Sequence, residues 1–452
     1  MTRWWYPRSA MLARVCLGLL LLAGSLAWSQ VNANGQDASA GSASETQLSV
    51  PPPVSGQSYA TTFSGETESN YLRYGIAFST GYSNDVSGGN PPIGSMSYSI
   101  WPTLALDRVT YRMHLLLNYS PGFTFYQRVS SLNQGNQNVA LSLQYRLSPN
   151  LTATLQEGFQ KTSNIFNQPN PLNATSVSGS APTPGVAIIV PAADQISNTT
   201  SAQVTYRISE SGMIGGSGNF ASLDYSNSNA VSGVFNSRSA GGSFFYSSRF
   251  RDRYYIGASY QYQNTLSYQS AAPSTRTQTD TIFLFLTTYL KPNLSLSISV
   301  GPQHYSSTQQ GLPTAASWQP MTMASVSWQG ERTTVAASYS RMVSGGGGLN
   351  GTFNSNNAGL SIMWRASRNW TTGISGGYSN YQTLTPLFVA STAGGHTLSG
   401  TVSAQRAISD RLNLQVGYNW THQTYADIGA ISNTPNINRV FVTLSFHFDR
   451  PL

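Results

Sequence analysis

Apolar and polar residues alternate along many segments of this chain. In the clearest segment the apolar residues Leu294, Leu296, Ile298 and Val300 alternate with the polar residues Asn293, Ser295, Ser297 and Ser299. Successive side chains of a β-strand point to opposite faces, whereas a helix would scatter these residues around its axis. The alternation recurs over residues 139–146 and 411–420. The pattern therefore predicts β-strands that have one apolar and one polar face.

A loose repeat organises these segments: a strand, a tight turn, a second strand and a longer polar loop. The predicted tight turns lie at residues 107–108, 148–150, 210–212, 251–253, 291–293, 329–331, 367–369 and 409–411. They carry turn-forming or charged residues. Looser stretches lie between them, as at 344–357 and 425–438. Short turns that alternate with long loops are typical of transmembrane β-barrels, whose turns are periplasmic and whose loops lie outside.

The expected fold class is all-β: a transmembrane antiparallel up-and-down β-barrel of about 18 strands, with a range of about 16 to 20. The strands are expected to begin near Tyr71, Met96, Val109, Asn138, Leu151, Asn198, Met213, Ser239, Tyr254, Gln278, Asn293, Ser317, Arg332, Asn356, Trp370, Gly395, Leu412 and Asn438. Two segments are less regular, because 282–286 is apolar on both faces and 213–225 changes phase midway.

Composition favours a membrane barrel over a soluble all-β repeat protein such as a propeller. Only 9% of the residues are charged, whereas soluble domains average about a quarter. After the first 30 residues, no apolar run reaches the roughly 18 to 20 residues that a membrane helix needs. Aromatic residues recur at strand ends, as interfacial girdles do, and include Tyr145, Tyr206, Trp328, Trp364, Trp370, Tyr418 and Trp420.

The first 29 residues have the features of a cleaved signal peptide. Arginines 3, 8 and 14 precede a short apolar segment, Val15–Leu22, and Ala27-Trp28-Ser29 is a suitable cleavage site. A retained membrane anchor is the alternative, but the apolar segment is short for spanning. Residues 30–70 are polar and of low complexity, which predicts a flexible periplasmic leader rather than a folded transporter plug. The barrel is expected over residues 71–452.

Processing leaves little charge and no thiol in the mature chain. Cys16, the one cysteine, lies in the signal peptide, so no disulfide or cysteine-based metal or haem site is expected. The formal net charge of +8 falls to 8 − 3 = +5 once the three signal arginines are removed. This modest charge gives no support for nucleic-acid binding.

The last strand carries an alternating apolar pattern that ends on an aromatic residue. Its apolar positions are Val440, Val442, Leu444, Phe446 and Phe448. This pattern resembles the outer-membrane β-signal that the barrel-assembly machinery recognises. In that signal the aromatic residue is usually the last one, whereas residues 449–452 follow it here.

From Tyr71 to Phe448 the chain resembles the outer-membrane β-barrel porins of Gram-negative bacteria. The resemblance rests on the hairpin pattern, the export signal and the terminal strand. It implies an integral outer-membrane protein that contacts membrane lipid and lipopolysaccharide, with homo-oligomers as one possibility. It transfers no solute and no functional residue.

Nothing in the sequence indicates catalysis. The five histidines, His114, His304, His396, His422 and His447, are far apart and show no metal-ligand spacing such as HExxH. Serines are so abundant that a chance Ser/His pair carries no weight. We therefore expect no enzyme activity, no metal and no cofactor.

The candidate pore-lining residues lie on the polar face of the predicted strands. They are Arg112, His114, Arg146, Arg207 and Arg365. A lumen lined by positive charge would favour anions. The alternative is that these side chains decorate the periplasmic rim, since Arg146, Arg207 and Arg365 lie near predicted turns. Only Arg112 and His114 are expected to lie deeper in the wall.

The longest predicted loop, Lys161–Ser197, contains five prolines and the apolar run Val186–Val190. Loops of this length are usually functional or disordered. It is the third outer loop, and the third loop of the porins that the chain resembles often narrows the lumen. An exposed ligand-binding or adhesive loop is the alternative. Two functions thus remain open: a passive channel for small polar solutes, and a non-channel barrel that serves as an envelope or polysaccharide-export scaffold or as an adhesin.

Overall fold

The computed structural model describes residues 70–86, 91–162, 195–225, 234–251, 253–269, 272–291, 293–309, 311–345, 347–384, 394–425 and 435–452. The predicted signal peptide, the leader up to residue 69 and most of the Lys161–Ser197 loop lie outside these ranges. In the described part of the chain, no helix has the length and apolar character to cross a membrane.

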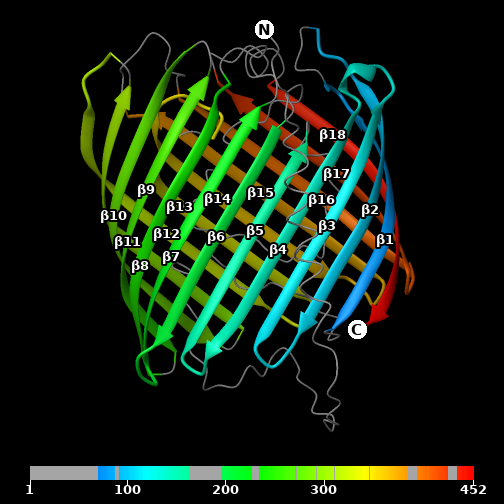
Figure 1. Cartoon of the computed structure of the whole chain (residues 1–452). Helices are drawn as coiled ribbons and strands as arrows, with labels where there is room; N and C mark the ends of the chain where they lie inside the picture. Colours follow the sequence, from blue (N-terminus) through cyan, green and yellow to red (C-terminus); the bar gives the residue numbers. More distant parts are fainter. Residues whose placement is uncertain are drawn as a thin grey trace, which may run out of the picture. The chain divides into compact units, whose positions relative to one another are not determined.

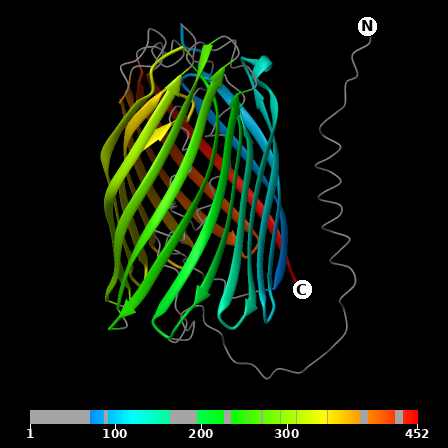
Figure 2. The same ribbon diagram turned by 60° about the vertical axis from the view of Figure 1, so that its left-hand side comes forward.

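The structure is a closed antiparallel sheet of 18 strands (Figure 1). Its strands are β1 (Tyr71–Ser83), β2 (Ser95–Val109), β3 (Met113–Tyr126), β4 (Gln134–Ser148), β5 (Leu151–Thr162), β6 (Gln195–Arg207), β7 (Gly212–Tyr225), β8 (Asn236–Phe250), β9 (Tyr254–Gln269), β10 (Ala272–Lys291), β11 (Leu294–Gln309), β12 (Ala315–Gln329), β13 (Thr333–Gly345), β14 (Thr352–Arg365), β15 (Trp370–Thr383), β16 (Gly395–Ser409), β17 (Leu412–Thr424) and β18 (Asn436–Pro451). Each strand pairs with its neighbours in sequence, and β1 pairs with β18 to close the ring. The tilted strands form one continuous wall when the barrel is turned (Figure 2).

The two ends of the barrel differ in the connections that they carry. Tight turns join β2 to β3, β4 to β5 and the following pairs at one end, where Tyr71 also pairs with Pro451. We call this the turn end and the opposite end the loop end. The expected strand count is confirmed, and most strands begin within four residues of the predicted position; β10 begins earlier, at Ala272 rather than Gln278.

The predicted turn at residues 107–108 was wrong. Both residues belong to β2, which continues to Val109, and the turn follows at Thr110–Arg112. Thr110 closes this turn: its backbone N–H donates to the Met113 carbonyl at 2.7 Å, and its Oγ1 accepts from the Met113 N–H at 3.1 Å. A threonine hydroxyl that bonds to the nearby backbone can stabilise a turn. The prediction missed this turn because it relied on charged and typical turn-forming residues.

The two faces of the wall are distinguished by exposure. Ser297 and Ser299 are 2% and 0% exposed, whereas Ile298 and Val300, which alternate with them, are 39% and 49% exposed. Large apolar residues are exposed on one side of all the strands except β5, and in a closed barrel that side is the outside. The predicted facing is therefore confirmed for this strand, with the serines lining the lumen.

The last strand shows the same alternation. The five apolar residues of the predicted assembly signal project outward on β18. The residues after Phe448 are part of the barrel, because β18 pairs with β1 as far as Pro451. The departure from the usual terminal aromatic thus has a structural use: Asp449 lies opposite Arg73 and joins the first strand to the last.

The two irregular segments are regular in register. β7 pairs with β8 from Gly212 to Leu223 without a shift, and β10 pairs with β9 without a shift from Thr275 to Thr288. Phe283 and Phe285 point into the barrel, whereas Leu284 between them is 63% exposed outside. These segments lose the apolar and polar alternation because part of the inner wall is itself apolar.

Candidate permeation pathway

Most of the inner wall is built from small polar side chains. Many inward residues on β8 to β11 are serines and threonines, and some of them bond to one another across the strands. Ser239 lies 3.0 Å from Thr265 between their hydroxyl oxygens, and Thr287 lies 2.9 Å from Ser297. On the opposite wall, Thr443 donates to Ser79 at 2.9 Å. Such a wall offers hydrogen bonds to water and polar solutes along its length.

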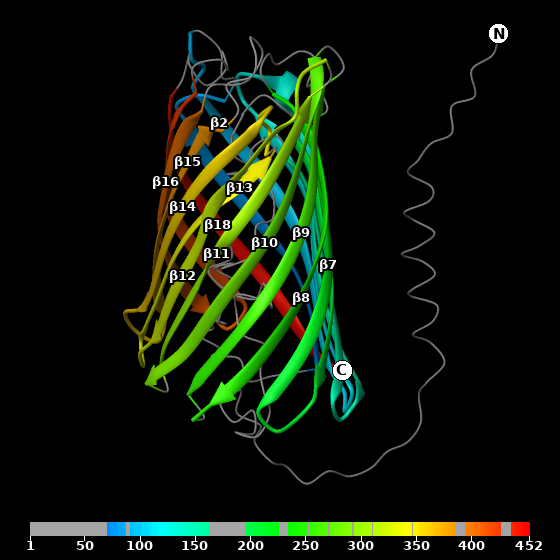
Figure 3. The ribbon, with the colours of Figure 1, turned by 90° about the vertical axis from the view of Figure 1, so that its left-hand side faces the viewer.

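The loop-end part of the β13–β14 hairpin separates from β12 and leans into the lumen, while β14 stays paired with β15 as far as Phe353. Pairing between β12 and β13 stops at Thr322 and Arg341, whereas β13 and β14 stay paired as far as Gly345 and Thr352. In Figure 3 the yellow end of β13 lies inside the ring of strands. We call residues 342–355 the inner hairpin.

Specific hydrogen bonds fasten the inner hairpin to a nearby part of the wall, two to three strands away from β13. The Val343 N–H donates to Oε1 of Gln303 at 2.7 Å, and Nε2 of Gln303 donates to the Val343 carbonyl at 3.3 Å. The Thr352 hydroxyl lies 2.7 Å from Thr277 and 2.8 Å from Ser307. The hairpin is therefore held against the inner faces of β10 and β11.

Glycines allow the approach and the tight tip. A Cβ at Gly345 would lie 2.8 Å from Oγ1 of Thr277, so any larger residue would push the hairpin off the wall. Gly347, Gly348 and Gly351 adopt positive φ angles, which favour glycine. The tip also accepts a hydrogen bond at the Gly348 carbonyl from the Phe235 N–H, at 3.0 Å.

The inner hairpin is one of the best-buried segments of the described chain. Leu349 and Phe353 are 0% exposed. Residues 344–357 were expected to form a loose outer loop, and this expectation was wrong. The hydrogen bonds to Gln303, Thr277 and Ser307 hold the segment inside, so it narrows the lumen beside β9 to β11.

An apolar patch lies on the same side of the inner wall. It comprises Met213, Phe245, Phe283, Phe285, Met321 and Met342, with Met323 packed against it. Inward glycines make room for the rings: a Cβ at Gly257 would lie 2.3 Å from the Phe285 ring, and one at Gly215 would lie 2.5 Å from the Phe245 ring. The lumen therefore has an apolar stretch on an otherwise polar wall.

Four arginines project inward at the turn end of even-numbered strands: Arg146 (β4), Arg207 (β6), Arg249 (β8) and Arg365 (β14). We call them the turn-end arginines. The backbone N–H of each donates to a carbonyl of the preceding hairpin turn, at 2.6 to 2.9 Å, so the wall positions each one. Arg146, Arg207 and Arg365 were predicted from the polar face. Arg249 was missed because Arg251 and Arg253 beside it were taken for turn residues, although its inward parity was readable from Phe245 and Ser247.

The other two predicted lining residues lie differently. Arg112 is in the turn between β2 and β3, so the expectation that it lies deeper in the wall was wrong. His114 points inward next to the turn end, with Nε2 3.3 Å from Oδ1 of Asp107. Because the turn lies later in the chain than predicted, both residues are closer to the mouth than expected.

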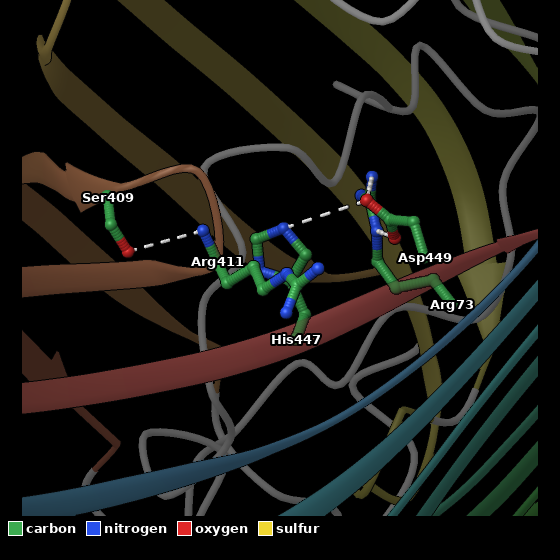
Figure 4. Close-up of polar contacts among 5 residues, drawn as sticks. All are labelled: Arg73, Ser409, Arg411, His447 and Asp449. Atoms are coloured by element: carbon green, nitrogen blue, oxygen red, sulfur yellow. Dashed lines mark hydrogen bonds and ion pairs between the residues drawn. The ribbon is translucent and has the colours of Figure 1, made fainter.

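A polar cluster joins the first and last strands at the turn end (Figure 4). Asp449 accepts from Nε of Arg73 at 2.5 Å and from Nη2 at 3.2 Å, and its carboxylate lies 3.9 Å from Nε2 of His447. The Arg411 N–H donates to the Ser409 hydroxyl in the adjacent turn at 3.4 Å. The Arg73–Asp449 ion pair is bidentate and lies across the two strands that close the barrel.

We expect the Arg73–Asp449 pair to contribute only modestly to stability. Both side chains are partly exposed, at 21% and 37%, so solvent screens the pair and Arg73→Ala should lower the free energy of unfolding by about 1 kcal/mol. A double-mutant cycle with Asp449→Ala measures the coupling energy between the two side chains. Unfolding in urea is monitored by the loss of heat-modifiable gel mobility. Full additivity of the two substitutions would show that the pair adds nothing to closure.

No group of three or more His, Cys, Asp or Glu side chains within the described ranges is arranged to hold a metal ion. The histidines that do approach each other, His396 and His422, project outward near the loop end with ring centroids 5.8 Å apart. Neither faces the lumen.

The chain was compared with protein families, curated proteins and solved structures. No family model matches the chain, and no curated protein matches its sequence. Among solved structures, Pseudomonas aeruginosa OccK2 (OpdF) aligns with 85% of this chain and 98% of its own, at 10% identity and a TM-score of 0.41. Its relative OccK1 (OpdK) aligns with 84% and 99%, at 11% identity and 0.39. The FrpB iron transporter of Neisseria meningitidis aligns with 79% and 63%, at 10% identity and 0.39.

The chain is an outer-membrane type of β-barrel. This conclusion rests on the closed ring of 18 strands and on the apolar outer face. The solved structures that it resembles share only this general fold.

Proposed function

We propose that the barrel is a passive channel for small polar solutes, with a preference for anions. The observation that supports this most directly is the largely polar inner wall, which runs from the loop end to the turn-end arginines and is interrupted on one side by the apolar patch. A barrel of 18 strands is wide enough for an aqueous passage. The inner hairpin makes that passage narrow, and narrow passages let wall charges act on each passing ion.

The electrostatic reasoning concerns the turn-end arginines. Four inward cations lie at the mouth, three on β4 to β8 and one across the ring on β14, whereas Asp107 and Asp449 lie on β2 and β18 and each contacts a basic side chain. Charges within about 10 Å are only partly screened at 0.1 M salt. The mouth therefore carries a net positive potential, which raises the local concentration of anions.

We expect neutralising the turn-end arginines to reduce anion preference. The fourfold variant with Arg146, Arg207, Arg249 and Arg365 all changed to Gln should bring the chloride-to-potassium permeability ratio close to the value of a neutral pore. The reversal potential of single channels in a salt gradient measures this ratio. Arg238→Gln is the matched control, because Arg238 projects outward near the loop end and stacks on Tyr268.

The alternative is a non-channel barrel, either a scaffold for envelope assembly or polysaccharide export or an adhesin. Planar bilayer recordings of the purified protein separate the two functions. Discrete conductance steps support the channel. Absence of steps from protein with intact heat-modifiable mobility would favour the scaffold or adhesin.

The outer surface completes the proposal. Apolar outward residues of the wall would contact membrane lipid. Polar outward residues near the loop end, such as Arg238 and Arg276, would contact lipopolysaccharide. The outward residues of β18 would serve the assembly machinery as its recognition signal. Export through the signal peptide would bring the chain to that machinery.

A further inference from the structure

One buried arginine of the lumen has guanidinium nitrogens that make no hydrogen bond within the described part of the chain. Arg439 projects inward from β18 near the loop end and is 3% exposed. Its Nε and Nη1 atoms are buried without a hydrogen-bond partner, and no carboxylate of the described chain forms an ion pair with it. An unpaired buried guanidinium is strongly unfavourable, so such a group points to an anion that completes the site.

The surroundings of Arg439 form a shaped cradle. Its guanidinium carbon lies 5.7 Å from the centroid of the Phe441 ring. That ring in turn lies over Gly417, where a Cβ would come within 2.4 Å of it. On the other side, a Cβ at Gly81 would lie 3.1 Å from Nε of Arg439. The Phe441 ring, which lies in the space above Gly417, and the space at Gly81 thus define where the guanidinium lies before any ligand arrives.

A second unpartnered polar group lies on the same face. Thr421 on β17 is 0% exposed, and its hydroxyl has no partner. It is diagonal to Arg439, since Asn419 is the direct cross-strand partner of Arg439. Diagonal positions on one face are about 7 to 8 Å apart, a span that a carboxylate or phosphate between them can bridge.

The position in the barrel makes this a site on the pathway. β18 and β1 are on the opposite side of the ring from β10 and β11, to which the inner hairpin is fastened. A solute that enters from the loop end must pass between the hairpin and the wall that carries Arg439.

We propose that Arg439 is the centre of a binding site for the carboxylate or phosphate group of a small solute, with Thr421 as a second hydrogen-bonding group. The inference deepens the proposed anion preference and rests on the lumen being a pathway. In this proposal the anionic group of the solute binds directly at the loop end. The turn-end arginines attract anions only through their long-range electrostatic potential.

The site is tested first by ligand-dependent stability, which does not require conduction. Purified barrel in detergent is heated in sodium benzoate or sodium phosphate, with chloride at equal ionic strength as reference, and unfolding is followed by heat-modifiable mobility. A saturable rise in melting temperature is expected for wild type. Arg439→Gln should raise the half-saturating concentration at least about tenfold, and Arg439→Lys should lie between, because it keeps the charge but not the planar donors.

Removing the unpaired charge should leave the barrel at least as stable in chloride, so a folded Arg439→Gln protein is expected. Arg276→Gln is the matched control, because Arg276 projects outward at the loop end and donates to Asn264 at 2.9 Å. Its ligand response should equal that of wild type. A response to benzoate alone assigns carboxylates, and a response to phosphate alone assigns phosphate esters.

Two results would overturn the inference: no saturable response in wild type, or an unchanged response in Arg439→Gln. In bilayers, the same anions should block the chloride current with the same order of affinities. If the protein does not conduct but the melting response depends on Arg439, the channel proposal fails and the binding site stands. If it conducts without any such response, the site fails alone.

Discussion

Removing the inner hairpin should at least about double the single-channel conductance, because the lumen beside β9 to β11 would lose the segment that narrows it. The variant joins Arg341 to Asn356 through an Asn-Gly turn in place of residues 342–355. These two residues are cross-strand partners at the level where β12 stops pairing, so a two-residue turn fits between them. The deletion also removes the three loop-end residues of β14 that pair with β15, Phe353–Ser355, but all other strand pairs outside the hairpin stay, so heat-modifiable mobility should be retained. Planar bilayer recordings provide the measurement.

Two milder variants distinguish the narrowing of the lumen by the inner hairpin from movement of the hairpin. Gln303→Leu removes both hydrogen bonds to the Val343 backbone and should make the open current noisier without changing the wall. Cysteines at 277 and 352, whose native hydroxyls are 2.7 Å apart, should cross-link the hairpin to β10 on oxidation. A conductance that stayed the same after the deletion would show that the inner hairpin does not limit permeation.

An arginine placed on the outer face should destabilise the barrel far more than one placed on the inner face. Ile298 is outward on β11, and Ile298→Arg should lower the free energy of unfolding by about 2 to 4 kcal/mol if the position is near the bilayer midplane. Ser325 is the matched inward position, half-buried on β12 and opposite Ser297. Ser325→Arg should cost well under half as much, because its side chain can reach lumenal water.

Refolding into lipid vesicles and unfolding in denaturant, followed by tryptophan fluorescence, measures both variants. Ser297 itself is a poorer control than Ser325, because it is 2% exposed and bonded to Thr287. Equal losses at Ile298 and Ser325 would contradict the assignment of inner and outer faces on which the barrel interpretation depends.

The sequence by itself determined the strands, their number and their facing. These are local properties: alternation with period two needs only neighbouring residues, and the difference between Ser297 and Ile298 is visible without any tertiary contact. The alternation of short turns with long connections likewise predicted an up-and-down order, which leaves the closing pair of β1 and β18 as the one long-range contact to infer. Turn positions were less certain, as the Thr110 turn illustrates, since one hydroxyl moved it by several residues.

Only the tertiary structure decided what lies inside the barrel. The inner hairpin is held by Gln303, Thr277 and Ser307, which are 40 to 75 positions away from their partners. Glycines and polar residues at 344–357 fit an exposed loop equally well, so composition could not choose between the two. Arg439 was readable as an inward residue from its parity with Phe441. The sequence could not show that Nε and Nη1 of its guanidinium lack hydrogen-bond partners, because that depends on the side chains of every strand around the lumen.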